Sequence, residues 1–306
     1  MIHSYFLENG KLIAKSGYSE DCQWLNIEGI GSEEISLLKK LGFHELAIED
    51  ILHGGQRMKV EDYKDYLFLT AAAIEPNTTP LHFYCFLSKE RVVTVASREL
   101  RGDNEVVQRC QKNPDAFSRG PDFILYLFLD YLTDKYFPLL DNLDEGLDKV
   151  EKKLFSQPDK ESLAKLLANK RKIIIFRRNL VALRDLALTL RQFEGRFISV
   201  KNIPYFQDVF DHLLRLAEKT DLMREAIATT FEGYLSILSN SLNEVMKRLT
   251  ALTVILMVPT LIAGIYGMNF VFLPASASAF GFYVILGLMI SLGLVLLYYF
   301  RKKKWL

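Results

Sequence analysis

Charged side chains are missing from one long stretch of the chain. Asp, Glu, Lys and Arg make up 25% of the 306 residues, yet the stretch from Leu249 to Phe300 contains none of them and no histidine. Two apolar runs, 249–266 and 280–300, occupy most of it. At about 1.5 Å per residue, the first run is nearly long enough and the second is long enough to cross a ~30 Å hydrocarbon core as a helix. We therefore predict two transmembrane helices joined by a short loop at 267–279.

The charges that flank these runs predict how they cross the lipid bilayer. Lys247 and Arg248 precede the first run, a basic tail at 301–306 follows the second, and loop 267–279 has no basic residue. Because basic residues stay on the cytoplasmic side, we expect both termini in the cytoplasm of a cell-membrane protein and the loop outside. The alternative is a buried helical hairpin in a soluble protein, and the two basic flanks argue against it.

Several catalytic and binding motifs are also absent. The sequence has no Gly-x-x-x-x-Gly-Lys-Ser/Thr loop, so we expect no nucleotide as an energy source. The five histidines are dispersed, and neither His-Glu-x-x-His nor Gly-x-Ser-x-Gly occurs, so no enzyme is indicated. The three cysteines include no Cys-x-x-Cys pair and are typical of reduced cytosolic thiols. A net charge of +1 gives no reason to expect nucleic acid as a partner.

Residues 1–120 have the pattern of a mixed α/β domain, expected in the cytosol. Short strands are predicted at 12–14 and 24–27, and a helix is predicted from Ser32, as its N-cap, to Gly42, which ends it. Three aromatic or β-branched runs follow at 66–72, 82–87 and 91–96. Turn-like segments separate these three runs, so they predict an antiparallel meander.

Helical periodicity dominates residues 121–203. Apolar residues recur there at three- and four-residue spacing, with an acidic face at 141–151 and a basic run at 165–184. Pro158 and Asp159 lie between these two charged segments and predict a turn. We expect an antiparallel pair of cytosolic helices. Their charged runs suit binding of ions or a partner, although a solvated helix face is the simpler interpretation.

A very long stalk helix is predicted at 204–266, because no proline occurs between Pro204 and Pro259. It carries the first membrane run, at about 249–266, at its end. One seam of this helix repeats every seven residues, which is typical of parallel helices that share an axis. The seam is unusually polar for a membrane and consists of Asn243, Met246, Thr250, Thr253, Met257, Thr260 and Gly264. Its pattern fits a tight helix–helix contact or a pore lining equally well.

The segment after the first membrane run, Tyr266-Gly267-Met268-Asn269-Phe270, resembles the motif of the CorA family of divalent-cation channels. Further resemblance is found at 243–247, before the first run, at the basic tail 301–306, and at 205–212, the base of the long helix. Glu49-Asp50 also resembles an acidic pair of that family's cytosolic domain. The tripeptide alone is a weak indicator, but its position after this span makes the likeness specific.

The resemblance implies a homopentameric, funnel-shaped channel whose long helices line one pore. It implies Mg²⁺ uptake, with Co²⁺ and often Ni²⁺ also accepted. The membrane potential is expected to drive the flux, and intracellular Mg²⁺ is expected to close the channel. Mg²⁺ would then be both the transported and the regulatory ion.

The matched positions imply three groups of site residues. The selectivity filter at the outer mouth would be Gly267, Met268 and Asn269. The pore lining would be Asn243, Met246, Leu249, Thr253, Met257, Thr260 and Gly264. The regulatory site would place Glu49 and Asp50 against Asp208 of a neighbouring subunit, with Asp130 nearby. Without the resemblance, Asp50 and Asp208 would be interpreted as ordinary surface carboxylates.

One departure from the family pattern affects the expected ion preference. Many relatives have acidic residues in the external loop, whereas residues 271–279 contain no carboxylate. A zinc transporter of the same superfamily therefore remains an alternative. A membrane-anchored structural or receptor protein is the alternative from another class, but it would give the polar seam no role.

Overall fold

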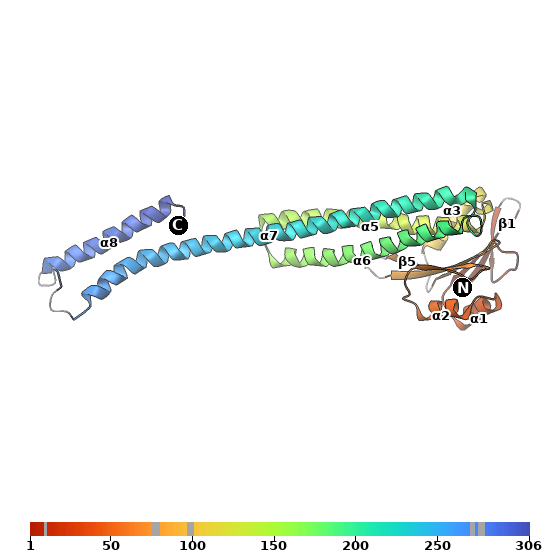
Figure 1. The fold of residues 1–306 in the computed structure, drawn as a ribbon, viewed down its shortest axis with the longest axis horizontal. Coiled ribbons are helices and arrows are strands. Elements are labelled where there is room, and N and C mark those ends of the chain that lie inside the picture. Colours follow the sequence, from red (N-terminus) through yellow and green to blue (C-terminus); the bar gives the residue numbers. More distant parts are fainter. Residues whose placement is uncertain (9–10, 75–79, 97–100, 270–272, 275–278) are drawn as a thin grey trace. The chain divides into compact units, whose positions relative to one another are not determined.

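The computed structural model describes residues 1–8, 11–74, 80–96, 101–269, 273–274 and 279–306. The chain forms two compact units, shown as a ribbon in Figure 1. The first comprises Met1–Leu154 and Asp159–Ala228, and the second comprises Phe155–Pro158 and Thr229–Leu306. Residues 76–79 of the turn-like segment 76–80, which was predicted between the first two aromatic or β-branched runs, lie outside the described residues. So do residues 270–272 and 275–278 of loop 267–279.

A seven-stranded sheet with the order β2-β1-β3-β7-β6-β5-β4 forms the base of the first unit. Its strands are β1 (Ile2–Glu8), β2 (Lys11–Ser16), β3 (Trp24–Glu28), β4 (Lys59–Asp62), β5 (Leu67–Ile74), β6 (Pro80–Leu87) and β7 (Val92–Ala96). The antiparallel pairing of β5, β6 and β7 confirms the predicted meander. Parallel pairing of β3 with β7 joins the N-terminal strands to it. The strands β1 and β4 were not predicted.

Helices cover both faces of this sheet. Helices α1 (Ser32–Lys40) and α2 (Glu45–His53) lie on one face, where Leu38 and Ile48 join a buried cluster with Phe68 and Phe86. On the other face, the Phe128 ring of α5 (Pro121–Ser156) lies edge-on to Trp24, with the ring centroids 5.4 Å apart. The predicted α/β domain is thus a layered structure with a core on each side of the sheet.

The start of α1 corrects one prediction. Ser32 is the first helical residue, and the N-cap is Gly31, which has extended backbone angles. The side chain of Glu34 reaches back and accepts a hydrogen bond from the Gly31 N–H at 3.1 Å, so the helix end is satisfied without the Ser32 hydroxyl. Gly42 follows the helix with a φ of +80°, as expected of a glycine that ends a helix.

The remaining helices of the first unit pack along one another (Figure 1). They are α3 (Arg101–Lys112), α4 (Pro114–Ser118), α5, α6 (Lys160–Leu190) and the first part of α7 (Ile203–Tyr266). Two 3₁₀ turns, Arg191–Phe193 and Val200–Asn202, connect α6 to α7. Ion pairs connect both charged helices to α7: Lys219 binds Asp141 of α5 at 2.6 Å, and Arg177 of α6 binds Asp221 at 2.6 Å. This role of α7 in the charge pairing was not predicted.

The second unit contains the rest of α7 and helix α8 (Ala279–Lys302). The 64 residues of α7 confirm the prediction of a single long helix, which continues through Pro259. Both helices contain an 18-residue window that is apolar enough to cross a membrane, with mean hydropathies of 2.1 and 2.5. Only 6% of each window is buried, so these windows are not the core of a soluble fold.

Candidate pore and metal sites

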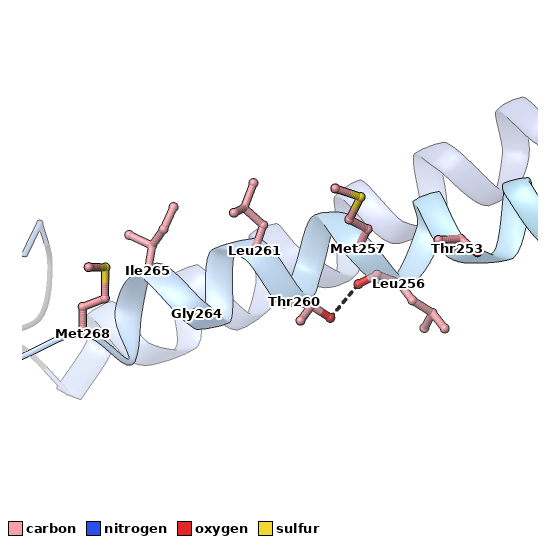
Figure 2. A pocket seen from close by; sticks show the side chains of 8 residues that line it. All are labelled: Thr253, Leu256, Met257, Thr260, Leu261, Gly264, Ile265 and Met268. Atoms are coloured by element: carbon pink, nitrogen blue, oxygen red, sulfur yellow. Dashed lines mark hydrogen bonds between the residues drawn. The ribbon is translucent and has the colours of Figure 1, made fainter.

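An open groove follows one face of the membrane part of α7 (Figure 2). Four residues predicted to line a pore also line this groove, namely Thr253, Met257, Thr260 and Gly264. The groove is completed by Leu256, Leu261, Ile265 and Met268. The opposite face of the helix is less exposed, and it includes Ala251, Val254, Ile255, Val258 and Ile262. The predicted lining therefore points away from the covered side of the second unit.

The predicted lining residues before the groove are open as well. Met246 and Leu249 are 58% and 57% exposed, and Asn243 is also exposed. An exposed fraction this high for large apolar side chains is unusual in a folded monomer. These residues therefore have room for contact with a partner or with lipid.

The two threonines of the groove use their hydroxyl protons inside their own helix. Thr253 Oγ1 donates to the Leu249 carbonyl and Thr260 Oγ1 donates to the Leu256 carbonyl, both at 2.8 Å. Figure 2 shows the second of these bonds. A hydroxyl group has one proton to donate and two lone pairs. Each threonine oxygen therefore offers the groove acceptor capacity only.

The predicted filter residues lie at the C-terminal end of this groove. Helix α7 ends with a hydrogen bond from the Gly267 N–H to the Ala263 carbonyl at 2.9 Å. A Cβ atom at Gly267 would lie 3.2 Å from that carbonyl oxygen, a tight contact that glycine avoids. Met268 lines the groove, and Asn269 follows it as an exposed residue. The structure thus places Met268 of the motif on the same groove as four residues of the polar seam.

The predicted regulatory carboxylates come from different layers of the first unit. Glu49 and Asp50 lie in α2, on the sheet face opposite α5, which carries Asp130. Asp50 forms an ion pair of 2.7 Å with Lys59, and its side chain is 17% exposed. Glu49 is exposed. Asp208 lies in the first part of α7, where its Oδ1 is 3.7 Å from His212 Nε2.

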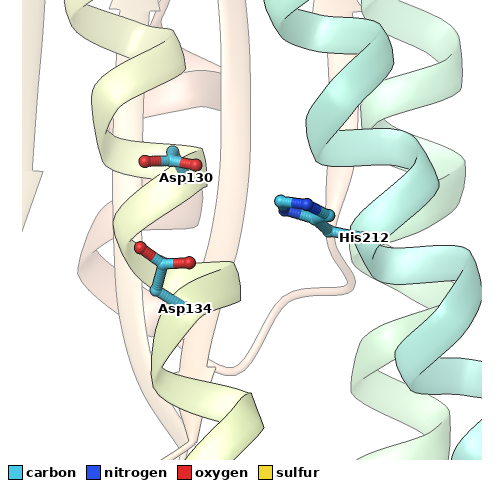
Figure 3. Close-up of side chains that lie close together, drawn as sticks. All are labelled: Asp130, Asp134 and His212. Atoms are coloured by element: carbon cyan, nitrogen blue, oxygen red, sulfur yellow. The ribbon is translucent and has the colours of Figure 1, made fainter.

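A cluster of three candidate metal ligands forms where α5 and α7 approach each other (Figure 3). Each of Asp130, Asp134 and His212 offers one ligand atom, and these three atoms lie within 4.8 Å of one another. Arg109 of α3 holds both carboxylates, at 2.6 Å from Asp130 and 3.3 Å from Asp134. His212 Nδ1 is buried and has no hydrogen-bond partner among the residues that the structure describes. The cluster therefore has spare ligand capacity.

Burial dominates the electrostatics of this cluster. Burial raises the pKa of Asp130 and outweighs the opposing effect of Arg109, and the charge of Asp134 raises it further. Burial, together with the charges of Asp130 and Asp208, raises the pKa of Tyr126 to about 12. Asp130 and Asp208 thus act on a common neighbour. Carboxylates are the ligands that Mg²⁺ prefers, whereas an imidazole suits Co²⁺, Ni²⁺ and Zn²⁺.

Asp134 and His212 were not predicted as site residues. Both follow a predicted carboxylate by four residues on the same helix, Asp134 after Asp130 and His212 after Asp208. Residues four apart lie on the same helix face, so this spacing was a usable signal.

Comparisons with known proteins cover nearly the whole chain. Residues 19–302 match the family model described as CorA-like Mg²⁺ transporter protein. The cobalt/magnesium transport protein CorA of Thermotoga maritima is 33% identical over 295 residues, which cover 92% of this chain and 83% of that protein. The complete structure of the CorA magnesium transporter from Methanocaldococcus jannaschii superposes with a TM-score of 0.89 at 24% identity and covers 100% of this chain and 99% of its own.

A zinc-related name also occurs among the similar structures. The ZntB cytoplasmic domain of Vibrio parahaemolyticus superposes with a TM-score of 0.65 at 14% identity, covering 78% of this chain and 98% of that domain. At these identities, both structural matches show the fold alone.

Proposed function

This chain belongs to the CorA-like Mg²⁺ transporter protein family, and on that premise we propose that it is a cell-membrane channel for Mg²⁺ that also admits Co²⁺. The family is one of divalent-cation transporters, and the relative at 33% identity is named for cobalt and magnesium. Both termini lie in the cytoplasm in this proposal, with Asn269 at the outer mouth. The basic residues that flank the two apolar helices support that orientation.

The groove on α7 is the observation that carries this proposal. It joins hydroxyl, thioether and glycine positions and ends at Met268. A single copy of α7 forms only one wall, because the groove is open on its other side. Five copies of α7 around one axis would close the walls into a pore, and the seven-residue repeat of the seam supports such a shared axis. The number of five copies is what membership of the CorA family implies, so the proposed channel is a homopentamer.

The chemistry of the groove suits a hydrated divalent ion. Mg²⁺ gives up its water molecules reluctantly, and the waters that it binds point their hydrogens outward. Oxygen acceptors are the groups that bind such hydrogens, and Thr253, Thr260 and the amide oxygen of Asn269 supply them. A lining without charge binds weakly enough for the ion to leave. A potential of 100 mV contributes roughly 2.3 kcal/mol per charge, or about 4.6 kcal/mol for a divalent cation.

Intracellular Mg²⁺ closes the channel in this proposal. A divalent ion held by Asp50 of one subunit and Asp208 of the next would favour the closed ring, because a ligand shifts the equilibrium toward the state that it binds better. The cluster of Asp130, Asp134 and His212 supplies further ligands close to Asp208. When cytosolic Mg²⁺ falls, the ion leaves and conduction is favoured.

Zinc transport is the second candidate, because the His212 imidazole suits zinc better than magnesium. Uptake by a strain that requires Mg²⁺ and lacks its own transporters separates the two. Expression of this chain should restore growth at low Mg²⁺, and Co²⁺ and Ni²⁺ should compete with Mg²⁺ uptake. Failure to restore growth together with Zn²⁺ accumulation would reject the magnesium assignment. Asn269→Ala is the matched control, since it should be expressed equally and remain inactive.

A further inference from the structure

Three of the four carboxylates proposed to bind the regulatory ion already have a basic neighbour in their own chain. Lys59 lies 2.7 Å from Asp50, Arg109 lies 2.6 Å from Asp130, and His212 lies 3.7 Å from Asp208. Lys59 and Arg109 are cations, so an incoming metal ion meets Asp50 and Asp130 with their charge already partly compensated. The Asp50 pair is the informative one, because Asp50 is only 17% exposed and its partner has a second anion within reach.

The structure gives Lys59 two equivalent partners. Lys59 opens the edge strand β4, opposite Thr70 of β5, and Glu61 lies two residues further along the same face of that strand. The Lys59 Nζ donates to Asp50 Oδ2 and to Glu61 Oε1, and both distances are 2.7 Å. Tyr63 donates its hydroxyl to the other oxygen of Glu61 at 3.3 Å, which helps to hold that carboxylate in place.

The ammonium group stays charged in this arrangement. Burial by itself lowers the pKa of Lys59, but the hydrogen bonds to Asp50 and Glu61 raise it by more, so the pKa lies above its usual value. Lys59 is therefore a permanent cation on Asp50 rather than a group that titrates near neutral pH.

We propose that Lys59 is a built-in competitor of the regulatory divalent cation: it occupies Asp50 when the ion is absent and moves to Glu61 alone when the ion binds. This inference rests on the proposed regulatory role of Asp50. The exchange leaves no cation without a partner: the Lys59 ammonium keeps its ion pair with Glu61, and Asp50 exchanges Lys59 for the divalent ion. The strength of the Lys59–Asp50 pair then sets the Mg²⁺ concentration at which the channel closes.

Two substitutions should move that concentration in opposite directions. Lys59→Met removes the competitor and should lower the Mg²⁺ midpoint about two- to fivefold, the range that partly exposed ion pairs support. Glu61→Gln leaves Lys59 with Asp50 alone, which strengthens the competitor and should raise the midpoint by a similar factor. Lys59→Arg keeps the charge and should shift the midpoint less than Lys59→Met. Lys165→Met, which removes an exposed ion pair with Glu161, is the matched control and should change nothing.

A double-mutant cycle separates competition from a general effect of charge. In the competition mechanism Glu61 acts through Lys59, so Glu61→Gln should have no effect in the Lys59→Met background. If the two charges act independently, the shifts add, and that result would overturn the proposal.

The midpoint is measured in two ways on the detergent-solubilised full-length protein and on membrane patches. Mg²⁺-dependent protection from limited proteolysis reports binding without any flux, and inhibition of the current by cytosolic Mg²⁺ reports gating. The expected result is the same pair of opposite shifts in both. Unchanged midpoints in both variants would reject a role for Lys59. If Lys59→Met does not assemble, the shift of Glu61→Gln to higher Mg²⁺ decides alone.

The variant Asp50→Asn separates a failure of the competitor mechanism from a failure of the proposed regulatory role of Asp50. If Asp50→Asn abolishes the protection by Mg²⁺ while the Lys59 and Glu61 variants behave as wild type, the regulatory site stands and the competitor is wrong. If Asp50→Asn leaves both the protection and the inhibition unchanged, the regulatory role of Asp50 is wrong. The competitor role of Lys59 is then rejected as well, because it depends on Asp50.

Discussion

Thr260→Val tests the idea that the α7 groove binds the water shell of an ion. The substitution replaces the hydroxyl by a methyl group of similar size. The substitution removes the 2.8 Å hydrogen bond from the Thr260 hydroxyl to the Leu256 carbonyl. That carbonyl keeps a partner, because in the helix it also accepts from the backbone N–H of residue 260. Thr260 is exposed, so no buried polar group loses its partner. The helix should therefore keep its structure, and only the acceptor in the groove disappears.

The expected loss of flux follows from the number of acceptors removed. A net hydrogen bond between neutral groups contributes about 0.5–1.5 kcal/mol. If a hydrated ion contacts roughly two of the ring's threonines at once, about 1–3 kcal/mol is lost, which corresponds to a decrease of about 5- to 150-fold in rate. Thr260→Ser keeps the hydroxyl and should stay within about threefold of wild type.

Mg²⁺ influx into proteoliposomes, followed with a trapped Mg²⁺-sensitive dye under an imposed potential, measures this difference. Equal amounts of assembled protein are required for all three proteins. If Thr260→Val conducts like Thr260→Ser, the hydroxyl oxygen does not contact the ion. If Thr260→Val raises thermal stability and leaves the flux unchanged, Thr260 packs between helices instead.

Four further outcomes are expected. Asn269→Ala should abolish uptake while leaving assembly intact, because it removes the amide oxygens at the mouth; normal uptake by an assembled variant would reject the filter assignment. Met246→Gly should raise the leak flux in liposomes by widening an apolar ring that gates by dewetting, and an unchanged flux would mean that Met246 only packs between helices. Asp208→Lys should place a fixed charge opposite Asp50 of the neighbouring subunit and make closure less dependent on cytosolic Mg²⁺, so an unchanged inhibition curve in patches would refute the site. The thiols of Cys22, Cys85 and Cys110 are buried, and burial raises the pKa of Cys110 to about 11. A thiol reagent at pH 8 should therefore label none of the three before the protein unfolds, and rapid labelling of the folded protein would contradict their burial.

Periodic and compositional features were predictable from the sequence. The long helix α7 and the apolar part of α8 follow from runs of helix-compatible residues whose ends are marked by glycine, proline or charge. The meander of β5 to β7 follows from aromatic and β-branched runs separated by turns. Each of these signals is local, so a single sequence contains it.

Features that depend on pairing across the sequence were missed. Strand β4 is short and highly charged, and it is a strand because it pairs with β5. The Asp130 cluster needs α5 and α7 to approach each other, and the partners of Asp130 and Asp50 come from α3 and β4. The chemistry of a carboxylate depends on its burial and on its ion-pair partners. Neither can be predicted from the residues next to it in the sequence. For this reason the sequence indicated which carboxylates to consider but not that Asp50 and Asp130 already have a cation beside them.

The size and the exposure of the predicted pore-lining residues argue for a pore over a tight helix contact. Interfaces between closely packed membrane helices are enriched in small residues, because these let the two backbones approach each other. The predicted pore lining includes three large apolar residues, Met246, Leu249 and Met257, as well as Thr253 and Thr260, and all five are exposed. Around a shared axis, the large apolar side chains would form constrictions. The threonines would form wider rings whose oxygen lone pairs face the pore axis. A hydrated ion needs acceptors where it rests and a barrier where flow is stopped, and these two kinds of residue supply both.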